Sequence, residues 1–189
     1  MRIIAGRHRG LTLASVGRGD ARAHLRPTSD RVRESMFNLL QNGGYGDPVR
    51  GARVLDMFAG TGALGLEALS RGAARVVFID DGKKAAQLIG RNIDLCAASE
   101  LCQLVRRNAI RPGPCPEAPF DLVFMDPPYG SGLGEQALIA AQAAGWIAED
   151  ALILCEENAA ITALPSFRRL DARRYGDTWV TILRQSGGS

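Results

Sequence analysis

The residue types best suited to chemistry stand together at positions 126 to 129, where the chain reads Asp-Pro-Pro-Tyr. They follow "FDLVFM", an apolar run of strand length. Pro127 and Pro128 have no backbone N–H to donate, so a strand must end here. A plain strand-ending turn would explain the prolines, but it would give the acid and the aromatic ring no role. We therefore interpret the stretch as a functional corner.

The corner offers the groups needed to hold a planar exocyclic amine. The lone pair of such an amine is delocalised into its ring, so the nitrogen must be oriented before it can attack an electrophile. The Asp126 carboxylate and the Pro127 carbonyl can accept the two N–H groups, and the Tyr129 ring can stack on the base. The prolines fix these acceptors in advance, so little reorganisation is needed at reaction. The corner predicts methylation of an amine.

A glycine-rich stretch upstream predicts a nucleoside-bearing cofactor. In "LDMFAGTGALG", Gly60, Gly62 and Gly65 match the G-x-G-x-x-G pattern that joins a strand to a helix. Asp80 ends the next predicted strand, 18 residues after Gly62, where an acid can accept hydrogen bonds from ribose hydroxyls. A purely structural tight turn is the alternative.

The glycine pattern does not separate a nicotinamide dinucleotide from S-adenosylmethionine, and Asp56 favours the second. This acid lies four residues before Gly60. A carboxylate would repel a pyrophosphate, whereas it would attract the ammonium and sulfonium groups of S-adenosylmethionine.

Alternating strand and helix patterns from residue 53 onward predict an α/β fold with a parallel sheet and helices on both faces. The last two apolar segments have no helix between them, so we expect an antiparallel pair at the sheet edge. Before this region, Thr28, Ser29 and Asp30 are suitable N-cap residues for an amphipathic helix. Two short segments around "RHRG" near the N-terminus predict a β-hairpin.

Positive charge is concentrated at the N-terminus. Residues 1 to 34 hold eight arginines against three carboxylates, a net charge of +5, although the whole chain carries only +3. An anionic partner reached by a basic arm follows from this distribution. A solvated, arginine-rich surface is the alternative. We expect nucleic-acid contacts from Arg2, Arg7, Arg9, Arg26, Arg31 and Arg33.

Other classes of protein have little support in the composition. The four cysteines form no C-x-x-C pair and there are two histidines, so we expect no metal site and no disulfide framework. No apolar run is long enough for a transmembrane helix, and the N-terminus lacks the apolar core of a signal peptide. We expect a cytoplasmic protein without membrane contacts.

Taken in order, these motifs resemble the class I S-adenosylmethionine-dependent amino-methyltransferases, and most closely the bacterial RsmD family. "RPTSDRVRESMFNLL", "DMFAGTGALGLEALSRGA", "DPPY", "GW" at 145 to 146 and "YGDT" at 175 to 178 all fit the pattern of that family. The resemblance covers nearly the whole chain. One departure is "RNA" at 107 to 109, where the family often has "GDA".

The resemblance implies a Rossmann-like, mostly parallel seven-stranded sheet with an antiparallel last strand and an N-terminal β-hairpin extension. The predicted division is a basic extension over 1–26 and a methyltransferase domain over 27–189. The implied activity is transfer of one methyl group to a guanine N2 of 16S rRNA, in the small ribosomal subunit or its assembly intermediate, by a monomer. The implied catalytic corner is Asp126–Tyr129, and the implied cofactor residues are Asp56, Phe58, Ala59, Gly60, Thr61, Gly62, Asp80, Asn108 and Ala109.

Three alternatives remain at this point. A DNA or protein-glutamine amino-methyltransferase shares the DPPY corner, although the chain is too short for the separate recognition region usual in the DNA enzymes. A nicotinamide-dependent oxidoreductase shares the glycine pattern, but His8 and His24 lie outside the predicted sheet. A non-catalytic RNA-binding module would explain the basic arm and leave the corner without purpose.

Overall fold

We describe a computed structural model that covers residues 1–15, 29–162 and 164–186. The helices and strands follow one another as predicted, with the following bounds: α1 Asp30–Asn42, β1 Arg53–Met57, α2 Ala63–Ser70, β2 Arg75–Ile79, α3 Lys83–Leu95, β3 Cys102–Val105, β4 Phe120–Met125, α4 Leu133–Ala143, β5 Ile147–Glu157, β6 Phe167–Tyr175 and β7 Thr178–Gln185.

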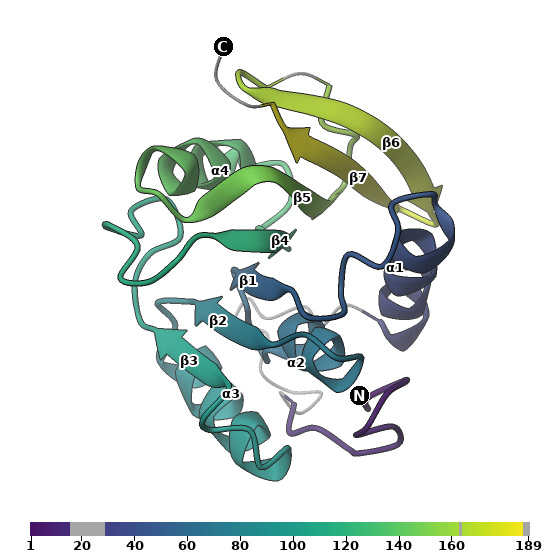
Figure 1. The fold of residues 1–189 in the computed structure, drawn as a ribbon, viewed down its shortest axis with the longest axis vertical. Coiled ribbons are helices and arrows are strands. Elements are labelled where there is room, and N and C mark those ends of the chain that lie inside the picture. The colour runs from purple at the N-terminus through teal and green to yellow at the C-terminus, as the bar shows by residue number, and fades with distance from the viewer. Residues whose placement is uncertain (16–28, 163, 187–189) are drawn as a thin grey trace.

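The seven strands form a single sheet in the order β3-β2-β1-β4-β5-β7-β6 (Figure 1). β3, β2, β1, β4 and β5 are parallel, whereas β7 is antiparallel to both β5 and β6. The predicted Rossmann-like class I fold is therefore confirmed, including the antiparallel pair at one edge. The strand order reverses between β1 and β4, and in sheets of this kind ligands bind beside the carboxyl ends of the strands at such a point.

Helices and loops cover the two faces of the sheet unequally. Residues of α1, α2 and α3 pack with one set of alternating strand residues, and those of α4 with the other set. Alternation is expected, because successive strand side chains point to opposite faces. β1 illustrates this: Val54 belongs to the first cluster and Leu55 to the second.

The first helix begins as the sequence predicts. Ser29 is its N-cap, and its hydroxyl accepts a hydrogen bond from the backbone N–H of Val32 at 3.2 Å. The buried face of α1 includes Met36 and Phe37, and the Phe37 ring lies 5.4 Å from the Phe124 ring of β4. α1 is thereby fixed on the sheet next to the antiparallel pair.

The described N-terminal segment, residues 1–15, is held against α2 and α3. Its predicted hairpin is reduced to one antiparallel bridge, Arg2 with Thr12. The backbone N–H groups of Ile4 and Ala5 donate to the Glu67 carboxylate at 2.8 and 3.0 Å. The Asn92 side chain accepts from the backbone N–H of Ala14 at 2.7 Å. The segment is therefore part of the packed structure.

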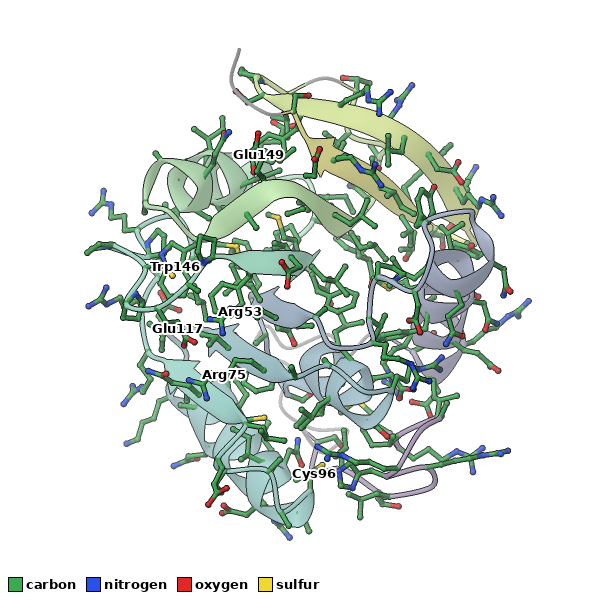
Figure 2. The ribbon with its side chains drawn as sticks, viewed as in Figure 1. Arg53, Arg75, Cys96, Glu117, Trp146 and Glu149 are labelled. Atoms are coloured by element: carbon green, nitrogen blue, oxygen red, sulfur yellow. The ribbon has the colours of Figure 1, made fainter. Side chains whose placement is uncertain are left out.

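A cluster of charged residues lies at the amino ends of β1 and β2, at the end of the sheet away from the glycine loop. Figure 2 shows Arg53, Glu117 and Arg75 next to one another, and both arginines pair with Glu117, at 2.6 and 3.1 Å. Arg53 also donates to the carbonyls of Ala118 and Pro119. These bonds fix the loop that leads into β4 and so the position from which β4 starts.

In the described part of the chain, no helix combines the length and the apolar character needed to cross a membrane.

Candidate active site

The glycine loop between β1 and α2 lies at the point where the strand order reverses. Phe58, Gly60 and Gly62 have positive φ angles of 57°, 57° and 76°. The left-handed region is strained for phenylalanine, at a typical cost of about 1–3 kcal/mol, and such strain is often found at functional sites. Two backbone bonds fix the loop: Ala59 N–H donates to the Ile79 carbonyl and Gly62 N–H to the Ala59 carbonyl.

The helix after the loop packs so closely on β2 that position 65 requires a glycine. A Cβ at Gly65 would lie 2.5 Å from the Phe78 ring and 2.7 Å from Val76. The third glycine of the sequence pattern therefore serves helix–strand packing, as it does in dinucleotide folds.

Asp56, at the end of β1, is 1% exposed and points one oxygen at the start of α2. Its Oδ2 accepts a hydrogen bond from the backbone N–H of Gly65 at 2.8 Å. Burial, opposed by this bond and assisted by the charge of Asp80, raises the pKa of Asp56 to about 8. Asp56 is then mostly protonated at neutral pH without a cofactor. A protonated Asp56 neither attracts the ammonium and sulfonium groups of S-adenosylmethionine nor repels a pyrophosphate. Asp56 alone therefore does not separate the two cofactors.

Asp80, at the end of β2, is better placed for direct cofactor contact because it is only partly buried. Its two oxygens accept backbone hydrogen bonds from Gly60 at 2.9 Å and Gly82 at 2.8 Å. Burial raises its pKa, and the two backbone bonds lower it. A carboxylate has about four lone-pair sites, so acceptor capacity remains for two ribose hydroxyls. The hydrogen-bond acceptors of Asp80 fit the ribose of a nucleoside at this position.

The next strand end supplies Asn108 and Ala109. Asn108 is exposed, and its Oδ1 accepts from the backbone N–H of Ile110 at 3.0 Å, while Ala109 is buried. The remaining lone pair of Oδ1 and the side-chain NH₂ group leave Asn108 able to bond an adenine edge. Together with Asp80 and the glycine loop, these residues fit S-adenosylmethionine, a nucleoside with a cationic amino-acid tail.

The corner at Asp126–Tyr129 leaves the sheet beside the glycine loop. Met57 of β1 is paired with Met125 of β4, so the chain leaves both strands at the same level, at Phe58 and Asp126. Pro127 is buried and packs so near Gly134 that a Cβ there would lie 3.0 Å from its Cγ. The Ser131 hydroxyl donates to the Pro128 carbonyl at 2.5 Å. These contacts add to the restriction that the two prolines place on the backbone of the corner.

The ring of Tyr129 is fixed through its hydroxyl, which sequence reasoning did not foresee. The hydroxyl donates to Glu156 Oε1 at 2.8 Å and lies 3.1 Å from Thr178 Oγ1. Burial is the largest cause of a strongly raised pKa of Tyr129, so its hydroxyl stays protonated. β5 and β7, which carry Glu156 and Thr178, thus orient the ring; Thr178 belongs to the "YGDT" motif, which was the available signal.

The predicted RNA-contacting arginines divide into three groups. Arg2, Arg7, Arg9 and Arg31 are exposed, and Arg26 lies outside the described residues. Arg33 was predicted wrongly: its side chain is fully buried, with Nη2 2.9 Å from Asp30 and Nε 3.7 Å from Glu67. Arg33 holds α1 to α2 and is not available to a phosphate.

Comparison with known proteins agrees with this geometry. Residues 1–184 match the family described as Conserved hypothetical protein 95. YlbH of Bacillus subtilis is 34% identical over 193 residues, covering 99% of this chain and 100% of the relative. The Escherichia coli K12 protein named Ribosomal RNA small subunit methyltransferase D is 38% identical over 161 residues, 84% of this chain and 75% of the relative.

Among solved structures, yhhF from Escherichia coli aligns over 100% of this chain and 99% of its own, with a TM-score of 0.81 and 33% sequence identity. A likeness at this level extends over the whole fold described above, from the N-terminal segment to the antiparallel pair. The chain therefore belongs to the family of Conserved hypothetical protein 95, which is the RsmD family of methyltransferases.

Proposed function

We propose that this methyltransferase transfers one methyl group from S-adenosylmethionine to the exocyclic N2 of a guanine in 16S rRNA. The observation that carries the proposal is the pairing of Met57 with Met125, which brings the cofactor loop and the Asp-Pro-Pro-Tyr corner to the same point of the sheet. A methyl donor at the loop then faces an amine at the corner.

Each part of the site has a role in this proposal. Asp80 holds the ribose, the loop Phe58–Gly62 surrounds the amino-acid tail, and Asn108 with Ala109 lies against the adenine. S-adenosylmethionine supplies an electrophilic methyl on a sulfonium. Asp126 and the Pro127 carbonyl accept the two N–H groups of the guanine amine, and Tyr129 stacks on its ring.

No strong base is needed at the corner before methyl transfer. The nitrogen forms its bond to the methyl carbon while the carbon–sulfur bond breaks. The nitrogen is then cationic, and it loses a proton readily. The task of Asp126 is therefore to orient the amine and to stabilise positive charge on it as that charge develops.

Exposed arginines of the N-terminal segment and of α1 support an RNA partner. Arg2, Arg7 and Arg9 place positive charge on the N-terminal segment, which touches the glycine loop, since the Thr61 hydroxyl lies 3.7 Å from the Met1 sulfur. Arg31 adds a further exposed charge on α1. Phosphate contacts of this kind position a substrate and weaken with salt. We further propose that the chain acts as a monomer in the cytoplasm, on the small subunit or its assembly intermediate.

A panel of substrates tests the proposal. The protein is incubated with methyl-labelled S-adenosylmethionine and, separately, with small ribosomal subunits lacking the modification, duplex DNA, and a peptide-release factor. We expect label in the RNA of the small subunits only. Label in DNA or in glutamine of the release factor would replace the proposed substrate by one of the two alternatives that share the corner.

A further inference from the structure

A shallow polar groove of about 290 Å³ runs between α1 and the end of β6. α1 lines it with side chains three and four residues apart, Ser35, Asn38 and Asn42, and β6 contributes Arg173 and Tyr175. Such spacing places the three α1 residues on one side of the helix, away from the buried face that packs on the sheet. The volume lies just below the range of small-ligand sites, about 300–1,000 Å³.

The groove adjoins the catalytic corner through the turn between β6 and β7. Tyr175 is the cross-strand partner of Thr178, and the Thr178 hydroxyl lies 3.1 Å from that of Tyr129. Side chains of directly opposed residues in an antiparallel pair lie on the same face, with Cβ atoms about 4.5–5.5 Å apart. The groove residue Tyr175 is therefore one cross-strand position away from the residue that contacts Tyr129.

The groups in the groove match the chemistry of an unpaired nucleotide. Asn38 is exposed and offers a side-chain amide that can pair with a base edge. The Asn42 amide nitrogen donates to the backbone carbonyl of Asn38 at 3.0 Å, and the side-chain oxygen of Asn42 remains an acceptor. Tyr175 offers a ring face, and the Arg173 side chain is 54% exposed. Single-stranded RNA is recognised by this combination of ring, amide and guanidinium.

Arg173 remains able to bind a phosphate although it forms an ion pair. Among the described residues its bond to Asp171, 2.9 Å long, uses Nε alone. A guanidinium has four further N–H donors, and an exposed pair of this kind exchanges easily with a stronger acceptor.

A protein partner is a poorer fit to this groove. In the described part of the chain, the large apolar side chains that are exposed are Leu95 on α3 and Ile139 on α4, and neither lines the groove. Protein interfaces are centred on a cluster of apolar or aromatic anchors, whereas this shallow groove offers Tyr175 and the largely buried Leu39 among polar side chains.

We propose that this groove binds the unpaired nucleotide next to the target guanine and contributes to the choice of RNA sequence around it. The inference rests on the proposed function and adds a second recognition site to it. The target base lies at the corner, its neighbour lies in the groove, and the basic N-terminal segment holds the phosphates beyond.

Two variants and two matched controls test the groove. Asn38→Ala removes the exposed amide and Arg173→Gln removes the charge. Gln87→Ala, an exposed amide on α3, and Arg168→Gln, an exposed arginine on the same strand β6, make the same chemical changes away from the groove. Methylation of small subunits lacking the modification is measured with labelled S-adenosylmethionine, and binding of S-adenosylhomocysteine by calorimetry confirms the fold.

We expect each groove variant to raise the KM for the RNA about tenfold, the loss expected for one base contact, with kcat and cofactor affinity unchanged. The controls should keep the wild-type KM. Groove variants that match the controls, or that lose kcat or cofactor affinity instead, would overturn the groove proposal while leaving the proposed function standing. A wild-type protein that transfers no methyl to small subunits would overturn both.

Discussion

Asp56 is the residue whose protonation should govern cofactor binding. Burial raises its pKa to about 8, and a cationic cofactor nearby favours the ionised form. Binding S-adenosylmethionine must then release a proton below that pH. We expect affinity to rise, by at most about tenfold per pH unit, as pH increases toward 8, and to level off above it.

Calorimetry between pH 6 and 9, in buffers of different ionisation enthalpy, measures both the affinity and the proton release. Asp56→Asn cannot ionise, so its affinity should lack this pH dependence. A wild-type affinity that is flat from pH 6 to 9 would show that Asp56 does not exchange its proton on binding. The same linkage acts on the cofactor-free protein: a carboxyl pKa raised from 3.8 makes its stability fall as pH rises from about 4 to 8.

Asp126 should matter for methyl transfer and little for the cofactor. Its carboxylate belongs to the corner, whereas the proposed cofactor contacts come from the ends of β1 and β2 and from the segment after β3. We expect Asp126→Ala to lower kcat by at least about 100-fold, the scale on which a preorganised transition-state contact acts. Binding of S-adenosylhomocysteine should stay near the wild-type value. Near-normal turnover would exclude the amine clamp.

The Tyr129 hydroxyl should contribute to stability as well as to the site. Tyr129→Phe keeps the ring but removes the donor to the buried Glu156, which costs about 1–3 kcal/mol of unfolding free energy. Thr178→Val is the matched change on the second partner and should be milder. Denaturant unfolding of the two variants measures the difference. A fully stable Tyr129→Phe protein would mean that the hydroxyl bonds do not hold the ring.

Local spacing accounts for the site residues that the sequence predicted. The glycine loop and the corner are each continuous along the chain, so residue types alone identify them. Glu156 and Asn92 reach the site by tertiary approach, which spacing does not reveal. Glu156 bonds the Tyr129 hydroxyl, and the Asn92 side chain donates to the Thr61 carbonyl of the glycine loop at 2.9 Å. Arg33 did carry a signal: it stands four residues before Phe37 and seven before Leu40, on the buried side of α1.

At the scale of elements, side chains of α2 and α3 hold the N-terminal segment, and the buried Glu67 carboxylate is one of them. Glu67 of α2 accepts from Ile4 and Ala5 and pairs with Arg71 at 2.7 Å, as well as with Arg33. Residues 1–15 are therefore packed on the fold, although three of their arginines stay exposed. Deleting this segment would remove two backbone hydrogen-bond donors from the buried Glu67 carboxylate, so charge-removing substitutions at Arg7 and Arg9 test RNA contact more cleanly.

Glu67→Gln tests how firmly the segment is attached. Removing one member of a buried ion pair leaves its partners uncompensated, and we expect the free energy of unfolding to fall by about 3–5 kcal/mol. Asp47→Asn breaks an exposed pair with Arg50 and should cost at most about 1 kcal/mol. Chemical denaturation compares the two, and equal small losses would show that the Glu67 bonds are weak in solution.

The predicted elements agree with the structure except at the N-terminal hairpin, which is reduced to one bridge, and at the start of β5, where polar residues hide part of a strand. The apolar run "ALILCEE" indicates a strand only from Ala151 onward, yet β5 begins at Ile147. The first part contains Glu149 and Asp150, and Asp150 has a positive φ of 61° beside a register shift in the pairing with β4. A bulge of this kind interrupts the alternation from which strands are recognised. The proposed division at residue 26 stays a prediction, since residues 16–28 lie outside the described part.

At the scale of the whole molecule, the sheet order brings together segments that lie far apart in the sequence. The reversal between β1 and β4 places the glycine loop beside the corner, and β7 brings Thr178 to the same end of the sheet. α1 and β6 then form the groove next to it, and the N-terminal segment touches the glycine loop. The β-α alternation in the sequence predicts the fold class. Which segments meet at the site depends on the order of the strands in the sheet, which the alternation does not reveal.

The identity of the methylated nucleoside tests the central claim most directly. Small subunits lacking the modification are treated with the protein and labelled S-adenosylmethionine, their 16S rRNA is digested to nucleosides, and the labelled product is identified by mass spectrometry. The account predicts one methyl group per RNA, on N2 of a single guanosine. Label on an adenosine, on a ribose or on a ring nitrogen of guanosine would contradict it.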